Sequence, residues 1–480
     1  MTTTFVRHFG HQSTRRLVGA AVALVALIGC NADRLSIPNF NESLVDQPAD
    51  RALLQNAVSG ILGEQRVLMA GLVSNVGIFG RESYNYTSSE PRNITLFLAT
   101  FPLDNSGFTN GQWDGRFRNM RNAVNVIRQV APATFINDAE KNAVRGFANT
   151  MRALDLFYVI ATRDSLGAPT IIDSLAPTPQ AFVNRDSVYR FISATLDQAA
   201  TQLSSAGTTA FPFRLTTGFV GFDTPATFLQ FNRALAARVL VYRGSMGCGA
   251  TCYTQALTAL TGSFISSTAT ADLRRGVYHV YSPSSGDLLN AISRQTAPDQ
   301  LAHPSIRPDA QRQAGGVLLD NRFITKVRTI PTRNAPGGIA VGIPTDVDFN
   351  LYIDQTTPIP IIRNEELILL RAEANIGLGL LPAALTDIND IRARAGSLPP
   401  IAAFASPTAA IDALLYERRY SLLWEGHRWF DLRRYDRINT IPLDIPTHFR
   451  VRVMPVPQAE CLARQLVIGA QPALRAPGCP

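Results

Sequence analysis

Apolar residues recur at every third or fourth position along much of the chain, a spacing that predicts amphipathic helices. The same spacing predicts helices over residues 48–72, 112–130, 138–160, 187–203, 225–242 and 252–260. Thr224 before Pro225 is typical of a helix start. Because the helices follow one another as neighbours, with small residues at the expected crossings, we predict a mainly α fold of tetratricopeptide-like pairs.

Two stretches of the chain lack this helical periodicity. Residues 74–111 are rich in Gly, Asn, Ser and aromatic residues, and residues 262–358 are rich in Gly, Pro, Ser and Thr. Within the second stretch, residues 276–281 and 317–327 predict short strands. No stretch after residue 46 has the composition of a linker between domains. We therefore expect residues 47–480 to form one helical body with a loop-rich segment at about 262–358.

The N-terminus has the order of a secretory signal peptide. Three Arg residues precede the apolar run Leu17–Ile28, and no acidic residue occurs before Cys30. The run is shorter than the ~20 apolar residues that a membrane-spanning helix needs. The sequence therefore predicts export of the chain rather than a spanning segment.

The end of this apolar run reads Leu27-Ile28-Gly29-Cys30, which resembles the lipobox of bacterial lipoproteins. The resemblance implies cleavage before Cys30 and lipidation of Cys30. We therefore expect a signal peptide over residues 1–29, a polar tether over residues 30–46 and a body anchored to a membrane by lipid. The alternative is a plain secretory signal with an incidental Cys.

Charge and composition are those of an ordinary globular protein. The hydrophobic fraction is 46% and the charged fraction 17%. Loss of the three Arg in residues 1–29 lowers the formal net charge from +8 to +5. No basic block of the kind found in nucleic-acid-binding proteins is present, so we do not expect nucleic acid as a partner.

Four of the five Cys remain if Cys30 carries lipid, and they lie as two local pairs. In an exported protein such pairs predict disulfides between Cys248 and Cys252 and between Cys461 and Cys479. A zinc site is the alternative, but zinc prefers four ligands and no His lies near Cys248 or Cys252. We expect no metal and no cofactor.

Residues 362–436 carry three charged blocks in a fixed order. They read Arg363-Asn-Glu-Glu366 followed by Ala372-Glu373-Ala374, then Asn389-Asp-Ile-Arg392-Ala-Arg394-Ala395-Gly396, then Glu417-Arg-Arg419 followed by Glu425-Gly426-His-Arg428 and Asp431-Leu-Arg. Gly396 is the residue expected to end its helix in a left-handed conformation. Together with Met454-Pro-Val-Pro457, these blocks resemble the SusD/RagB family of outer-membrane nutrient-binding lipoproteins.

The resemblance implies a SusD-like fold and a location at the bacterial outer membrane, lipid-anchored and facing the cell surface. It also implies a SusC-like TonB-dependent barrel as partner, to which the protein delivers a bound nutrient. Two departures stand out: Ser421 occupies a position where the family usually has Glu, and the tail carries Cys461 and Cys479.

The charged residues of the third block invite comparison with an active site. Arg is a poor general acid or base because it stays protonated. Glu425 and Arg428, and Arg428 and Asp431, are three residues apart and could pair along one helix. We therefore expect structural ion pairs and no enzyme activity at this cluster, which comprises Glu417, Arg419, Glu425, Arg428 and Asp431. A secreted hydrolase on a helical scaffold is the alternative from another class.

Ligand binding is the better-supported role. Sugars are held by aromatic faces together with planar hydrogen-bonding side chains. In the family, ligand residues come from the loop after the first helix and from the irregular segment past the middle. The candidates here are Arg81, Tyr84, Asn85 and Tyr86 in the first region and Tyr278, His279 and Tyr281 in the second. We expect a glycan as ligand; a peptide, as in RagB-type members, is the alternative.

Overall fold

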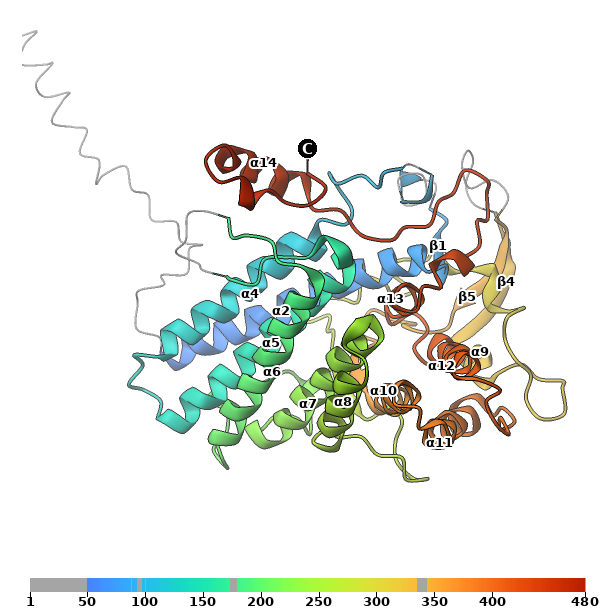
Figure 1. Ribbon diagram of the computed structural model, residues 1–480, viewed down its shortest axis with the longest axis horizontal. Helices are drawn as coiled ribbons and strands as arrows, with labels where there is room; N and C mark the ends of the chain where they lie inside the picture. Colours follow the sequence, from blue (N-terminus) through green and yellow to red (C-terminus); the bar gives the residue numbers. More distant parts are fainter. Residues whose placement is uncertain are drawn as a thin grey trace, which may run out of the picture. The chain divides into compact units, whose positions relative to one another are not determined.

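Helices stacked in chain order form most of the structure, a computed structural model that describes residues 50–479 except 88, 93–96, 100, 173–178 and 335–342 (Figure 1). The first group comprises α2 (Arg51–Phe79), α4 (Gly111–Val130), α5 (Asp138–Arg163), α6 (Arg185–Ser205), α7 (Pro225–Arg243) and α8 (Ala250–Thr261). The second comprises α9 (Asn321–Lys326), α10 (Asn364–Gly377), α11 (Leu381–Ile391), α12 (Pro407–Ser421), α13 (Arg428–Arg434) and α14 (Gln458–Ile468). The mainly α prediction is confirmed.

Neighbouring helices pack against one another in the way that tetratricopeptide-like pairs require. α2 packs on α4, α4 on α5, α5 on α6, α6 on α7 and α7 on α8, and α10 then packs on α7, α8, α11 and α12. Side chains fix the helix starts: Asn137 and Glu140 form a capping box at α5, and Thr224 and Thr227 form one at α7. Local sequence therefore sets the first turn of both helices.

Short antiparallel strand pairs lie between the helical parts. β1 (Ser83–Asn85) pairs with β3 (Gln300–Ala302), β2 (Gly276–His279) with β6 (Ile359–Arg363), and β4 (Val327–Arg333) with β5 (Thr345–Phe349). The strand predicted at 317–327 is wrong over most of its length. Asp320 accepts a hydrogen bond from the backbone N–H of Arg322 at 2.9 Å, and this cap starts the helix α9 instead.

The end of α11 also differs from its prediction. The α-helix stops at Ile391, a π turn follows over Arg392–Gly396, and Ser397 rather than Gly396 takes the left-handed conformation, with φ 53°. Gly396 instead lies at a close approach: a Cβ there would be 3.0 Å from the guanidinium of Arg322 and would require that side chain to shift.

The C-terminal part covers the end of α2. A Cβ at Gly77 would overlap the ring of Trp424, so the helix can carry no side chain at this position. Trp429 packs against Phe79 with ring centroids 5.2 Å apart, and its Nε1–H donates to the carbonyl of Val451 at 2.8 Å. Residues far apart in the sequence therefore share one core.

Both predicted disulfides, Cys248–Cys252 and Cys461–Cys479, are present. The first fastens the turn between α7 and α8, and the second closes the C-terminal segment that contains α14. This segment docks through Arg464, whose Nη2 donates to the carbonyl of Gln180 at 2.9 Å while its guanidinium lies over the ring of Phe182.

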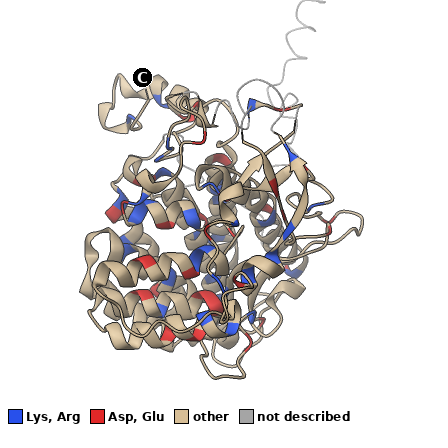
Figure 2. Cartoon of the chain, turned by 90° about the vertical axis from the view of Figure 1, so that its right-hand side faces the viewer, with Lys and Arg blue, Asp and Glu red and all other residues tan. Residues whose placement is uncertain are grey.

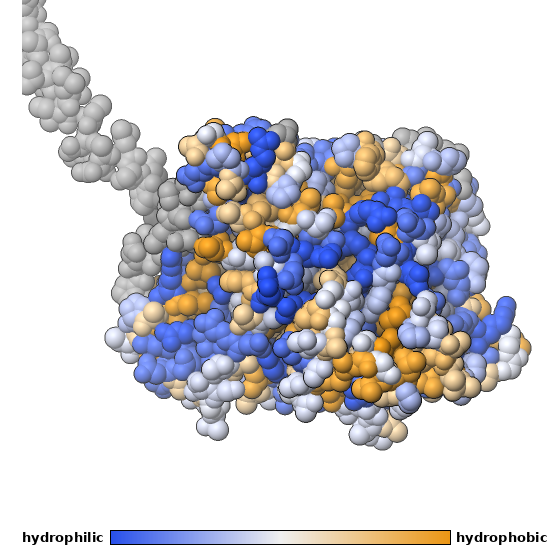
Figure 3. Space-filling view, in the orientation of Figure 1, coloured by the Kyte–Doolittle hydropathy of each residue, from blue (hydrophilic) through white to orange (hydrophobic). Residues whose placement is uncertain are grey.

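Within the described residues, none of the helices combines the length and apolar character that crossing a bilayer demands. On the face drawn in Figure 3, hydrophobic residues form separate groups between hydrophilic ones. Figure 2 shows Lys and Arg interleaved with Asp and Glu along the helices. Cys30 and the expected signal peptide and tether lie outside the described residues.

Candidate functional site

The first group of predicted ligand residues lies at the end of α2 and in β1, and most of it is buried. Tyr84, opposite Leu301 in β3, is 2% exposed, and Arg81 and Tyr86 are equally enclosed. The Tyr84 hydroxyl donates to the carboxylate of Asp444, and the Tyr86 hydroxyl donates to the carbonyl of Ile343 at 3.0 Å.

Asp444 is the centre of this buried group. Arg81 Nε donates to its carboxylate at 3.0 Å, and His303 Nε2 lies 3.1 Å from the other oxygen. Burial alone would raise the pKa of Asp444, but hydrogen bonds from His303 and Tyr84 and the charge of Arg81 outweigh it and hold this pKa well below its usual range. The group fastens the segment that carries Asp444 to β1 and β3.

Tyr84 and Tyr86 are thus buried, with their hydroxyls bonded within the chain, and their role as ligand residues stays a prediction. Sequence alone cannot separate a binding Tyr from a core Tyr, because both combine an apolar ring with a hydroxyl that needs a partner. Asn85 alone among the first four candidates keeps a half-exposed side chain.

The second group of predicted ligand residues lies in and after β2. Tyr278 is half-buried and its hydroxyl donates to the carbonyl of Arg274, whereas His279 and Tyr281 are buried. Burial, with the nearby charges of Arg116 and Arg66, lowers the pKa of His279 to about 3. Tyr278 is therefore the more accessible of the two predicted Tyr residues, and the ligand role of both stays a prediction.

An exposed aromatic residue, Phe101, lies against the partly buried Phe449, and neither was among the predicted ligand residues. Phe101 is 81% exposed and meets the ring of Phe449 edge to face, with centroids 5.4 Å apart. The backbone N–H of Phe449 donates to the carbonyl of Leu98 at 2.7 Å, which joins the two segments. An aromatic residue before Pro in the Asn- and Gly-rich stretch 74–111 was the available sequence clue.

The C-terminal charged cluster forms buried ion pairs, but not the pairs that the sequence spacing suggested. Glu425 pairs with Arg363 at 2.8 Å, and Asp431 pairs with Arg418 at 2.7 Å. Arg428 donates to the carbonyl of Gly80 at 3.1 Å instead. Glu425 precedes α13, which begins at Arg428, so the two never share a helix and the predicted Glu425–Arg428–Asp431 ladder is wrong.

The remaining members of the cluster pair with residues from other elements. Glu417 pairs with Arg392 at 2.7 Å and with Arg322 at 2.6 Å, and Arg419 pairs with Asp309 at 2.6 Å. Ser421, the departure from the family pattern, accepts a hydrogen bond from Arg322 at 3.0 Å. Within the part of the chain described here, no three His, Cys, Asp or Glu side chains group as a metal site.

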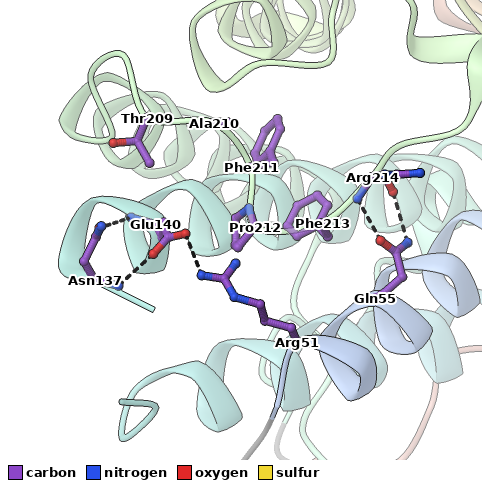
Figure 4. A pocket seen from close by; sticks show the side chains of 10 residues that line it. All are labelled: Arg51, Gln55, Asn137, Glu140, Thr209, Ala210, Phe211, Pro212, Phe213 and Arg214. Atoms are coloured by element: carbon purple, nitrogen blue, oxygen red, sulfur yellow. Dashed lines mark hydrogen bonds and ion pairs between the residues drawn. The ribbon is translucent and has the colours of Figure 1, made fainter. Parts of the chain in front are cut away.

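An open pocket of about 390 Å³ lies at the start of α2, and we call it the α2–α5 pocket (Figure 4). Three segments line it: the first turns of α2, the start of α5, and residues 209–214 between α6 and α7. Its lining residues are Arg51, Gln55, Asn137, Glu140, Thr209, Ala210, Phe211, Pro212, Phe213 and Arg214. The volume is at the small end of the ~300–1,000 Å³ typical of ligand pockets.

Comparison with known sequences gives the same family that the three charged blocks indicated. Residues 345–460 match the SusD family. SusD-like protein P38 of Formosa agariphila is 34% identical over 98 residues, which are 19% of this chain and 19% of that protein. The match thus spans about a fifth of the length of this curated relative.

Solved structures extend the likeness over most of the chain. A SusD superfamily protein from Bacteroides vulgatus superposes with a TM-score of 0.65 at 14% identity, covering 86% of this chain and 97% of that one. Surface glycan-binding protein A from Bacteroides uniformis gives 0.64 at 15% identity, covering 88% and 99%. The protein of that name from Bacteroides thetaiotaomicron, in complex with laminarihexaose, gives 0.61 at 13% identity, covering 88% and 98%. At these identities the likeness establishes the fold.

Proposed function

We propose that the chain, whose residues 345–460 match the SusD family, is a lipid-anchored outer-membrane protein that binds an oligosaccharide and passes it to a SusC-like TonB-dependent transporter. The observation that carries the proposal is the SusD-like fold over most of the chain, shared with surface glycan-binding proteins. Binding without turnover agrees with the structural roles of the charged cluster, whose carboxylates are all paired with Arg.

A lipid tether would allow a protein with modest ligand affinity to support nutrient uptake. A body held near the barrel by a lipid anchor and a polar linker meets it at high effective concentration, so ligand transfer does not depend on tight binding in bulk solution. The proposed anchor is Cys30, and the proposed linker is residues 30–46.

Affinity electrophoresis tests the binding function. Mature protein is run in native gels that contain laminarin, starch, xylan or pectin, and we expect slower migration in at least one gel with no new reducing ends in the polysaccharide. Unchanged migration in all gels, together with binding to a mixed peptide library, would favour a RagB-like peptide binder. Release of new reducing ends would favour the hydrolase.

Phe101 is the residue that we expect to contact the glycan. Its exposed ring next to Phe449 offers a face for sugar C–H groups, and we take about 0.5–1.5 kcal/mol, the contribution of an aromatic ring pair, as the scale of such a contact. Phe101→Ala should therefore weaken polysaccharide binding by up to about tenfold while the free energy of unfolding changes by less than ~0.5 kcal/mol.

The matched control is Ile171→Ala, because Ile171 is also an exposed large apolar side chain. It should leave binding unchanged. Equal affinity for Phe101→Ala and wild type would contradict the role of Phe101. Tyr84→Ala would not serve here, because Tyr84 is buried and its loss acts on folding.

Cys30→Ala tests the anchor. Without a lipidated Cys, we expect the protein to move from the membrane fraction to the soluble exported fraction, measured by fractionation and by the acyl mass on the N-terminal peptide. Wild-type protein pulled from native membranes should bring a large β-barrel with it. Unchanged membrane retention of the variant, with no acyl mass on the wild type, would argue against lipidation.

A further inference from the structure

The α2–α5 pocket has one apolar wall made by stacked rings. Phe211 and Phe213 lie with centroids 4.8 Å apart and planes 23° apart, and Phe213 packs on Phe147 at 5.1 Å. Pro212, which lies between Phe211 and Phe213 in the sequence, is half-buried. The core ring of Phe147 supports this wall, and Pro212 lines the pocket together with both rings (Figure 4).

A reciprocal hydrogen-bond pair holds this wall in place. Gln55 Nε2 donates to the carbonyl of Arg214 at 3.1 Å, and the backbone N–H of Arg214 donates to Gln55 Oε1 at 2.8 Å. The Gln55 side chain thus joins the 209–214 segment to α2 through both polar groups of the Arg214 backbone. These hydrogen bonds fix the position of the 209–214 segment and with it one wall of the pocket.

The opposite wall carries planar charged groups (Figure 4). Arg51 Nη2 lies 3.3 Å from Glu140 Oε1 and donates to the carbonyl of Phe135 at 3.3 Å. Glu140 Oε2 accepts from the backbone N–H of Asn137 at 2.9 Å. A guanidinium has five N–H donors and a carboxylate about four acceptor positions, so both groups retain capacity for a ligand.

We propose that the α2–α5 pocket is a second saccharide site, which holds one or two sugar rings at the end of an oligosaccharide. This inference rests on the proposed glycan-binding function and places a site away from β1 and Phe101. On their wall Arg51 and Glu140 neutralise each other, which suits an uncharged polyol there, while the exposed Arg214 adds one positive charge on the other wall. Their adjacent donors and acceptors match vicinal hydroxyls, and Pro212 with the two rings suits an apolar C–H face.

Two sites on one chain affect which ligands are retained. An oligosaccharide long enough to reach both would rebind at one site while held at the other, so long chains would be held more tightly than short ones. A disaccharide would occupy the α2–α5 pocket alone.

The test is saturation-transfer NMR of the mature protein with maltose, cellobiose, laminaribiose and mannobiose. We expect transfer to at least one disaccharide in the wild type. Ala210→Trp fills the pocket from an exposed lining position and should lower this binding at least tenfold. Arg51→Gln removes the charged donors and should weaken it as well, which covers the case that Ala210→Trp folds poorly. Val220→Trp is the control, because Val220 is exposed and outside the lining.

The outcomes separate this inference from the proposed function. Both pocket variants should still be retarded in the polysaccharide gels through the Phe101 region. Disaccharide binding equal to wild type in both pocket variants would overturn the second site, as would absence of disaccharide binding by a wild type that is retarded in the gels. Absence of both kinds of binding would overturn the proposed function together with the second site.

Discussion

Arg238→Met is expected to lower the free energy of unfolding by about 3–5 kcal/mol. Arg238 in α7 forms two bonds to Glu366 in α10, at 2.7 and 2.6 Å, and donates to the carbonyl of Ile361 at 2.6 Å. Both charged side chains are almost fully buried. Removal of the guanidinium leaves the Glu366 carboxylate without its partner in a site where water cannot replace it.

Urea denaturation at pH 7.5 measures the effect, and two variants make it specific. Arg190→Met removes a surface pair with Asp186, in which both side chains are 61% exposed, and should cost no more than ~0.5 kcal/mol. Arg238→Met combined with Glu366→Met removes both charges and should recover part of the lost stability, because the penalty comes from an uncompensated charge. A loss below 1 kcal/mol in the single variant would contradict this account.

The free energy of unfolding should also fall steeply as the pH drops from 6.5 to 4.5. Burial, with charges from neighbouring Arg as a smaller cause, lowers the pKa of His279 to about 3 and that of His427 to about 4. In this pH range the unfolded chain binds a proton at each His while the folded chain does not. Stability is therefore complete above the ordinary His pKa and is lost as the pH falls below it.

Buried carboxyls whose pKa burial raises act in the opposite direction, and Glu82 has the largest resolved effect among them. Burial raises the pKa of Glu82 to about 7, so below that pH the folded chain holds a proton that the unfolded chain lacks, and acidification stabilises this site. Its stabilising effect offsets about one His. His303 and His448, whose pKa values burial also lowers, add to the loss of stability at low pH. We expect a net loss on the order of 1–3 kcal/mol per pH unit.

Urea denaturation at several pH values between 7.5 and 4.5 measures this slope. His427→Gln should reduce the slope by about 1.4 kcal/mol per pH unit, whatever its effect at pH 7.5, because one titrating group is removed. A pH-independent free energy of unfolding in the wild type, or an unchanged slope in the variant, would show that these His titrate as they do in water.

The sequence predicted the helices well because their determinants are local. The 3.6-residue periodicity of α4 to α8 and the caps at Asn137 and Thr224 lie within each segment. The disulfides could also be predicted, since the joined Cys residues are only 4 and 18 positions apart in the sequence. Short-range information was sufficient for these features.

The burial of individual side chains and their hydrogen-bond or ion-pair partners could not be predicted from the sequence. Tyr84 is fixed by Asp444, which lies 360 residues further along the chain, and Glu425 by Arg363, 62 residues earlier. No pattern near Tyr84 or Glu425 identifies such partners, so the sequence suggested a ligand residue and a local helix pair instead. Phe101 shows the converse, because only the fold reveals that its ring is exposed.

The contact of Trp424 and Trp429 with the end of α2 bears on the order in which the chain can fold as it is synthesised. α4 to α8 can each pack on the helix before it as soon as it emerges, because these contacts are close in sequence. The surface around Gly77 and Phe79 has to wait until more than 340 further residues have appeared. A nascent or truncated chain therefore presents an uncovered apolar surface, which holding chaperones would need to shield until the C-terminal third arrives.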